Sequence, residues 1–201
     1  MKSGARGRRT PNMRSFIALE ISLEARDAIA EFQRELRRVD PAVSWTRPEN
    51  LHLTLRFLGE LDDSIATAVG AALADAVGEL QPFDLELSHP GVFPDLRRPR
   101  VVWVGLKGEL DRLNDLRIAV EKAVEPFGYP AEKAAFRPHL TIGRVKGERN
   151  IREMLARSEL YVMPRVRFAS REIVLFRSDL QPGGSRYTAI RRAALGYKQL
   201  S

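Results

Sequence analysis

Two matched tetrapeptides constrain this chain more than any other feature. His52-Leu53-Thr54-Leu55 and His139-Leu140-Thr141-Ile142 both read His-apolar-Thr-apolar, and they use two of the three histidines in the 201 residues. Alternation of polar and apolar residues is typical of a strand with one buried face. Because residues i and i+2 of a strand project from the same face, each segment predicts an imidazole beside a hydroxyl on a strand anchored in the core.

Two such strands on either side of a groove predict a site for proton transfer at a small anion. An imidazole titrates near neutral pH, so His52 and His139 can supply a general acid and a general base. The hydroxyls of Thr54 and Thr141 can donate hydrogen bonds to negative charge that develops during the reaction. A strand is also a rigid support, which a catalytic arrangement requires.

A metal site is the rival interpretation of the paired histidines, since imidazole is a common metal ligand. Neither motif carries a carboxylate beside its histidine, and the chain contains no His-Glu-x-x-His pair. A Ser-His-Asp triad is conceivable, but no Gly-x-Ser-x-Gly elbow occurs. The chain has no cysteine, which excludes disulfides, a cysteine nucleophile and thiolate-bound zinc. We therefore expect no metal and no other cofactor.

Hydrophobic periodicity and turn residues divide the chain into short elements. Ser22 and Ser64 resemble the N-caps of two helices. Each half of the chain offers a strand, a helix and a His-x-Thr strand, an order that favours antiparallel or mixed sheets with helices packed on one face, and so an α+β fold. The expected strands are residues 14–22, 43–45, 51–58, 83–87, 101–106, 138–145, 166–176 and 187–192, and the expected helices are residues 22–39, 64–80, 110–127 and 151–155.

The composition is that of a globular protein, with 44% hydrophobic and 29% charged residues. No apolar run approaches the 18 residues of a membrane-spanning helix. The net charge is +7, but four of the 33 basic residues lie in residues 1–12, which we expect to form a flexible basic tail. Without those four, 29 basic residues face 26 acidic ones, so the single domain expected over residues 13–201 is mildly basic. The absence of cysteine suits a reducing cytoplasm.

Aromatic residues near the motifs allow two interpretations. Phe57 lies just beyond the first motif, where it can pack in the core or contact a nucleobase. Trp45 and Trp103 are expected in the core, as large apolar side chains usually are. The third histidine, His89, precedes a proline in the stretch 89–95, which predicts a surface turn rather than a functional site.

The residues around both motifs match a known family. The chain resembles the 2H phosphoesterase superfamily, which is named for its two His-x-Thr/Ser-x motifs, and within it the RNA 2′,3′-cyclic phosphodiesterases, also called 2′-5′ RNA ligases. The similarity extends over most of the chain from Met13 onward, and the two motif segments are its specific part. The matching segments are residues 14–19, 45–60, 99–106, 136–144 and 175–178, together with Tyr187.

This resemblance implies a bilobal α+β fold with two sheets and helices packed outside, in which each lobe donates one motif strand to a central cleft. It implies that His52 donates a proton to the departing 3′-oxygen and that His139 accepts a proton from the attacking water. Thr54 and Thr141 would hold the non-bridging phosphate oxygens. Arg144 matches a family arginine that contacts the phosphate, although strand alternation would point it away from His139 unless Gly143 permits a bulge.

The implied substrate is an RNA with a 2′,3′-cyclic phosphate end, or a cyclic nucleotide, which would be hydrolysed to a 2′-phosphomonoester without a metal. Ligation of such an end to a 5′-hydroxyl through a 2′-5′ link could use the same residues. A non-catalytic module that binds nucleotides or RNA is a third possibility, against which the two complete motifs argue. We expect a monomer and no association with membranes, because no heptad pattern or exposed apolar stripe predicts a partner.

Overall fold

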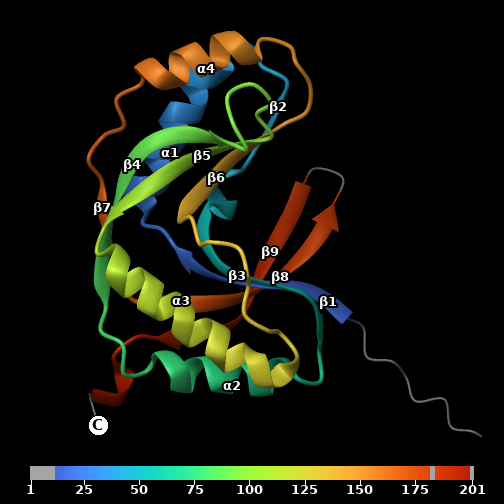
Figure 1. Cartoon of the computed structure of the whole chain (residues 1–201), viewed down its shortest axis with the longest axis vertical. Helices are drawn as coiled ribbons and strands as arrows, with labels where there is room; N and C mark the ends of the chain where they lie inside the picture. The colour runs from blue at the N-terminus through green and yellow to red at the C-terminus, as the bar shows by residue number, and fades with distance from the viewer. Residues whose placement is uncertain (1–11, 182–183, 200–201) are drawn as a thin grey trace, which may run out of the picture.

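The computed structural model describes residues 12–181 and 184–199, and its centre is a curled antiparallel sheet (Figure 1). Within the described residues the strand order is β7-β4-β5-β6-β3-β1-β8-β9, with β2 beside β6. The strands are β1 (Asn12–Glu20), β2 (Val43–Trp45), β3 (His52–Asp62), β4 (Phe83–Phe93), β5 (Val101–Gly108), β6 (His139–Val145), β7 (Arg167–Ser170), β8 (Glu172–Gln181) and β9 (Gly184–Ala194). The helices are α1 (Leu23–Arg37), α2 (Ala66–Val77), α3 (Leu110–Val124) and α4 (Ile151–Leu160), with short 3-10 turns at Pro48–Asn50, Glu125–Phe127 and Tyr197–Gln199.

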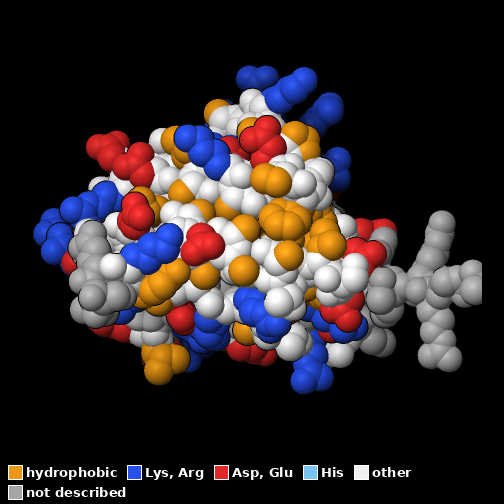
Figure 2. Space-filling model, turned by 90° about the horizontal axis from the view of Figure 1, so that it is seen from below, with side chains coloured by type: hydrophobic (Ala, Val, Ile, Leu, Met, Phe, Trp, Pro, Cys, Tyr) orange, Lys and Arg blue, Asp and Glu red, His pale blue; other side chains and the backbone are white. Residues whose placement is uncertain are grey.

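The helices lie in two pairs at opposite ends of the molecule (Figure 1). At one end α4 packs against α1 and β4, and at the other α2 packs against α3 and β9. The end formed by α2 and α3 carries charges of both signs interspersed with apolar side chains (Figure 2). No helix among the described residues is long and apolar enough to cross a membrane. The α+β class expected from the sequence is confirmed.

The expectation of two sheets is wrong, because one sheet runs through both halves of the molecule. The halves join where β3 pairs with β6, and this pairing consists of Leu53 opposite Leu140. Both leucines are buried in the main core, so the junction is fastened by apolar packing as well as by the backbone. The two motif strands are therefore neighbours in one sheet.

Apolar residues on successive positions of β1 divide between two clusters on opposite faces of the sheet. Ile17 and Leu19 belong to the main core beneath the helices, whereas Phe16 and Ala18 form a small second cluster with residues of β8. Alternation of side chains along a strand produces this division. The second cluster lies on the face that carries the motif histidines.

Several local expectations were confirmed. The Ser22 hydroxyl accepts a hydrogen bond from the Ala25 amide at 3.1 Å and caps α1. The structure also confirms the strand over residues 43–45 and both motif strands. The helix expected at 110–127 ends as α3 followed by a 3-10 turn, and Gly128 stops it with a φ of 90°, which favours glycine.

Other boundaries differ from the expectation. Ser64 does not cap α2; its amide instead binds the Asp62 carboxylate, and the helix begins two residues later. Residues 89–93, expected as a turn, continue β4, and α4 is twice as long as the short helix expected at 151–155. The strand expected at 166–176 is divided at Arg171 into β7 and β8. Of the expected basic tail, residues 1–11 lie outside the described residues, and Asn12 belongs to β1.

Candidate active site

The four motif side chains lie together on one face of the joined strands. Because β3 and β6 are antiparallel and Leu53 is opposite Leu140, His52 lies beside Thr141 and Thr54 lies beside His139. Side chains directly opposite each other in such a pair have Cβ atoms about 5 Å apart. The two leucines point to the opposite face and are buried in the core. Two imidazoles and two hydroxyls thus form a small quadrilateral on a rigid support.

His52 is fixed by hydrogen bonds at both ring nitrogens. Its Nδ1 lies 2.7 Å from the Asn50 carbonyl oxygen and its Nε2 lies 3.0 Å from the Thr54 hydroxyl. A carbonyl oxygen can only accept, so Nδ1 carries the hydrogen and donates it. Burial is the main cause that lowers the pKa of His52 to about 4; the bond to Asn50 partly opposes it, and the charge of His139 adds to the lowering. At pH 7 the Nε2 of His52 is therefore unprotonated and accepts from Thr54.

Aromatic side chains hold the His52 ring in place. It stacks on Phe16 with ring centroids 4.7 Å apart, and the Tyr187 ring meets it edge-on at 5.3 Å. Phe176 lies behind Phe16 at 5.3 Å, in the second hydrophobic cluster. This apolar surrounding desolvates the ring and accounts for its low pKa.

A small cavity of about 200 Å³ opens beside His52. Phe176 and Tyr187 form its apolar wall. Its polar wall includes Glu20, which is opposite His52 in β1, and Arg192, whose guanidinium lies 2.6 Å from the Glu20 carboxylate. The ion pair fixes the edge of the cavity next to the histidine.

His139 has a similar but more open environment. Its Nδ1 lies 2.7 Å from the Arg137 carbonyl oxygen, so this nitrogen also donates and leaves Nε2 free to exchange a proton. The ring of Phe93 meets it edge-on at 5.0 Å, and Trp103 lies at 6.5 Å. Each motif histidine is therefore oriented by the carbonyl two residues before it and supported by aromatic rings.

Each motif strand contains a β-bulge, an extra residue relative to its neighbouring strand. The bulge changes the alternation, so one residue beyond it lies on the same face as the histidine. In β3 the register passes from Thr54 opposite Ala18 to Arg56 opposite Ile17, so Leu55 is an extra residue. Phe57 is consequently opposite Phe16, and their rings are 6.1 Å apart. Phe57 is 60% exposed, which excludes core packing, the first of its two interpretations, and leaves contact with a nucleobase as the other.

Strand β6 contains a β-bulge of the same kind. Thr141 is opposite Trp103 and Gly143 is opposite Val102, so Ile142 is the extra residue. Arg144 is then opposite Val101, which shares a face with Trp103 and therefore with Thr141. The bulge that would bring Arg144 back toward the site is present, and its side chain is exposed. Phe57 and Arg144 each follow their histidine by five residues.

Supporting aromatic residues were missed or misassigned in the sequence. Trp103, expected in the core, lies beside Thr141 on the histidine face, and Phe93 lies against His139. Phe16 was not singled out, although an unbroken apolar run in a strand indicates that both faces are covered. That run, residues 16–19, was the signal for a second apolar layer behind His52.

The described residues include no group of three or more His, Cys, Asp or Glu side chains that could hold a metal ion. The donor set at the quadrilateral consists of two imidazoles and two neutral hydroxyls. Such a set suits proton transfer and hydrogen bonding to an anion.

Comparisons with known proteins find relatives that match most of the chain. The chain is 34% identical over 178 residues to the RNA 2′,3′-cyclic phosphodiesterase of Methanothermobacter thermautotrophicus, covering 88% of this chain and 95% of the relative. It is 31% identical over 178 residues to the protein of the same name from Thermotoga maritima, covering 89% of this chain and 93% of the relative.

Solved structures share the fold. TT0787 of Thermus thermophilus superposes with a TM-score of 0.76 at 27% identity, covering 92% of this chain and 98% of that one. E. coli LigT complexed with 3′-AMP superposes with a TM-score of 0.72 at 27% identity, covering 92% and 99%. A family model described as the 2′-5′ RNA ligase superfamily matches residues 19–182. This chain, with both motifs in place on one sheet, belongs to the 2′-5′ RNA ligase superfamily.

Proposed function

We propose that this protein hydrolyses RNA 2′,3′-cyclic phosphate ends to 2′-phosphomonoesters by proton transfer between two histidines. The observation that carries the proposal is the quadrilateral of His52, Thr54, His139 and Thr141 on adjoining strands. The relatives from M. thermautotrophicus and T. maritima bear the name RNA 2′,3′-cyclic phosphodiesterase, which supports the same reaction here.

In the proposed reaction His139 is the proton acceptor and His52 is the proton donor. The Nε2 of His139 takes a proton from water as the water oxygen attacks phosphorus, and the bond between phosphorus and the 3′-oxygen breaks. The Nε2 of His52 gives its proton to that oxygen, which leaves as the 3′-hydroxyl. Each proton transfer contributes typically about 10²–10⁴-fold to the rate. Thr141 donates a hydrogen bond to a non-bridging oxygen, whose negative charge grows in the transition state.

Protonation of His52 also prepares Thr54 for its proposed role. In the neutral site the Thr54 hydroxyl hydrogen is used in the bond to His52 Nε2. Once Nε2 carries a proton, it becomes a donor, and the hydroxyl hydrogen of Thr54 is released for a phosphate oxygen. A single protonation therefore supplies both the acid and a second hydrogen-bond donor.

We expect the bound phosphate to favour protonation of His52 by raising the pKa of its ring. Burial keeps the pKa of His52 at about 4 in the empty site, whereas a proton donor must be charged when the reaction starts. An anion beside the ring favours the imidazolium, so the pKa of His52 should rise when a nucleoside 2′-monophosphate binds. An NMR titration of the His52 ring with and without this ligand measures the change. A pKa that stays near 4 in the complex would contradict the assignment of His52 as the acid.

Phe57 and Arg144 complete the proposed substrate site. The exposed ring of Phe57 offers an apolar surface to the terminal nucleobase, since bases stack readily on aromatic side chains. Arg144 carries a positive charge on the histidine face, where it would attract the phosphate. We infer that the two halves of the molecule act as lobes around this site, because β3 and β6 pair at one position only. The cytoplasmic location, the monomeric state and the single domain over residues 13–201 stay predictions.

The test is an assay of the purified protein, treated with EDTA, against a nucleoside 2′,3′-cyclic phosphate. We expect turnover to the 2′-monophosphate, with a bell-shaped dependence of kcat on pH because one group must be charged and the other neutral. Restoration of activity only by added metal would overturn the mechanism, and binding of the 2′-monophosphate without any turnover would favour a non-catalytic module.

Ligation through a 2′-5′ link is the second candidate, favoured by the description of the matching family model. It is the reverse of cleavage at such a link, so the same acid and base serve both directions. Incubation of a labelled oligonucleotide with a cyclic phosphate end, with and without a 5′-hydroxyl partner, separates the two. A product longer than the labelled strand would identify ligation.

A further inference from the structure

A second and much larger cavity lies on the β4–β5 side of the sheet. Its volume is about 1000 Å³, which is in the range of sites that hold whole small molecules. Its wall includes Trp103, His89 and Tyr161, together with residues of α4. Trp103 borders both this cavity and the histidine site, since it also lies beside Thr141 and its ring centroid is 6.5 Å from that of His139. The cavity therefore adjoins the catalytic groups across one aromatic side chain.

The strands are shaped to accept the Trp103 ring. A Cβ atom on Gly91 would lie 2.3 Å from the indole, so only glycine lets the ring lie against β4 at this position. Phe93 and His89 contact the ring at centroid distances of 5.0 and 5.8 Å. The indole N–H is buried and has no hydrogen-bond partner among the described residues. An aromatic surface thus borders the cavity.

Two arginines, Arg97 and Arg165, supply positive charge to the cavity. The ammonium of Lys107, which also lines it, is paired with the Glu86 carboxylate at 3.0 Å, and the carboxylates of Asp95 and Glu159 complete its charged groups. The Asp95 carboxylate already accepts hydrogen bonds from the backbone amides of residues 97 and 98, so it is committed to its own loop.

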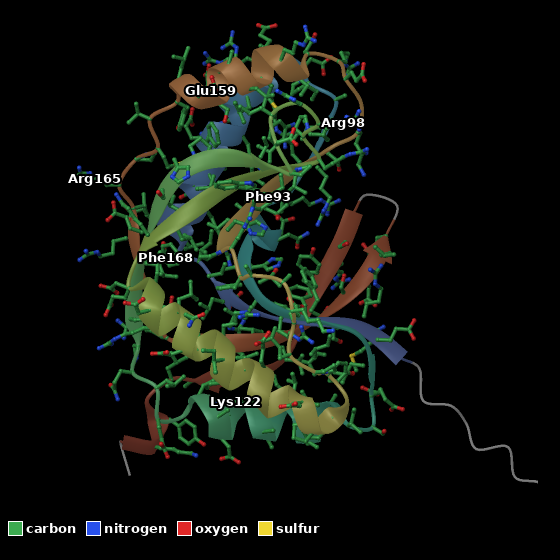
Figure 3. The ribbon with its side chains drawn as sticks, viewed as in Figure 1. Phe93, Arg98, Lys122, Glu159, Arg165 and Phe168 are labelled. Atoms are coloured by element: carbon green, nitrogen blue, oxygen red, sulfur yellow. The ribbon has the colours of Figure 1, made fainter. Side chains whose placement is uncertain are left out.

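The charged groups line the cavity from several elements. Arg165 follows α4 at the outer edge of the molecule, whereas Phe93 lies near its centre beside the motif strands (Figure 3). Arg97 is contributed by the loop between β4 and β5. Neither arginine forms an ion pair within 4 Å in the described part of the chain, although the charge of Arg165 acts on Glu86, so both guanidinium groups can meet phosphate groups.

We propose that this cavity binds the nucleotide that precedes the cyclic phosphate end of an RNA strand. The proposal rests on the proposed function and extends it: the preferred substrate is an oligonucleotide rather than a cyclic mononucleotide. The base stacks against Trp103 or His89, and the phosphates on either side meet Arg97 and Arg165. Proteins that hold single strands combine these two features, aromatic platforms and a cationic groove.

The kinetic test compares a nucleoside 2′,3′-cyclic phosphate with a trinucleotide that ends in the same nucleotide. We expect kcat/KM about tenfold or more higher for the trinucleotide, the size of one base–aromatic stack. In Arg97→Ala/Arg165→Ala this ratio should fall toward one. The control Lys122→Ala/Arg171→Ala removes two positive charges outside the cavity and should keep the ratio; Lys122 lies on α3 (Figure 3).

Equal kcat/KM for the two substrates in the unchanged protein, or an unchanged ratio in Arg97→Ala/Arg165→Ala, overturns the inference while leaving the proposed function intact. If neither substrate is turned over, the proposed function fails, and binding then tests the cavity by itself. In Trp45→Phe, Trp103 is the one remaining tryptophan. A trinucleotide ending in a 2′-phosphate should quench its emission more than the matching nucleoside 2′-monophosphate does. Equal quenching by both overturns the inference.

Discussion

Replacing either His52 or His139 by alanine is expected to lower kcat for a 2′,3′-cyclic phosphate by at least about a hundredfold. Each substitution removes one of the two proton-transfer groups, and a single such group contributes about 10²–10⁴-fold. The two rings lie on adjoining strands, so each substitution leaves one half of the proposed acid–base pair in place. Single-turnover rates for the two variants and the unchanged protein measure the loss.

Of the two variants, His139→Ala should change the catalytic chemistry with less effect on the fold. His52 is packed between Phe16 and Tyr187, so its removal also disturbs an aromatic cluster. His139 is less enclosed, and its alanine variant should unfold at a temperature close to that of the unchanged protein. A melting curve for each variant separates loss of chemistry from loss of structure. Near-normal turnover by either folded variant would remove that histidine from the mechanism.

The part of the site that strand alternation defines could be predicted from the sequence. His52 and Thr54 share a face because they are two residues apart, and the leucine between them is buried on the other side. The same reasoning holds for His139 and Thr141. Ser22 was recognisable as a cap because its hydroxyl bonds the backbone only three residues away. Interactions of this range are present in the local sequence.

The rest of the site depends on contacts between distant segments. Phe57 and Arg144 reach the histidine face only because Leu55 and Ile142 are extra residues relative to the neighbouring strands. A bulge is a mismatch between two strands, so neither strand shows it alone. Gly143 hinted at the second bulge, whereas no glycine marks the first.

The single sheet has a similar cause. The resemblance implied two sheets, and nothing in the local sequence says that the motif strand of one half pairs with the motif strand of the other. The joint consists of Leu53 opposite Leu140, two residues 87 positions apart. Their apolar character indicated burial but not partnership.

The pairing of Leu53 with Leu140 makes Leu140→Ala a substitution with a large expected effect on stability. The side chain is fully buried, and it packs in the main core where β3 meets β6. Truncation of a buried leucine leaves a cavity and lowers the free energy of unfolding by about 2–5 kcal/mol. Chemical denaturation followed by circular dichroism measures the change.

Leu160→Ala is the matched control, because it makes the same truncation at the end of α4, where the side chain is 83% exposed. Its free energy of unfolding should stay within about 0.5 kcal/mol of the unchanged protein. If Leu140→Ala were as stable as this control, the contact between β3 and β6 would not hold the halves together. The quadrilateral of histidines and threonines would then need another support, because its geometry follows from that one pair of leucines.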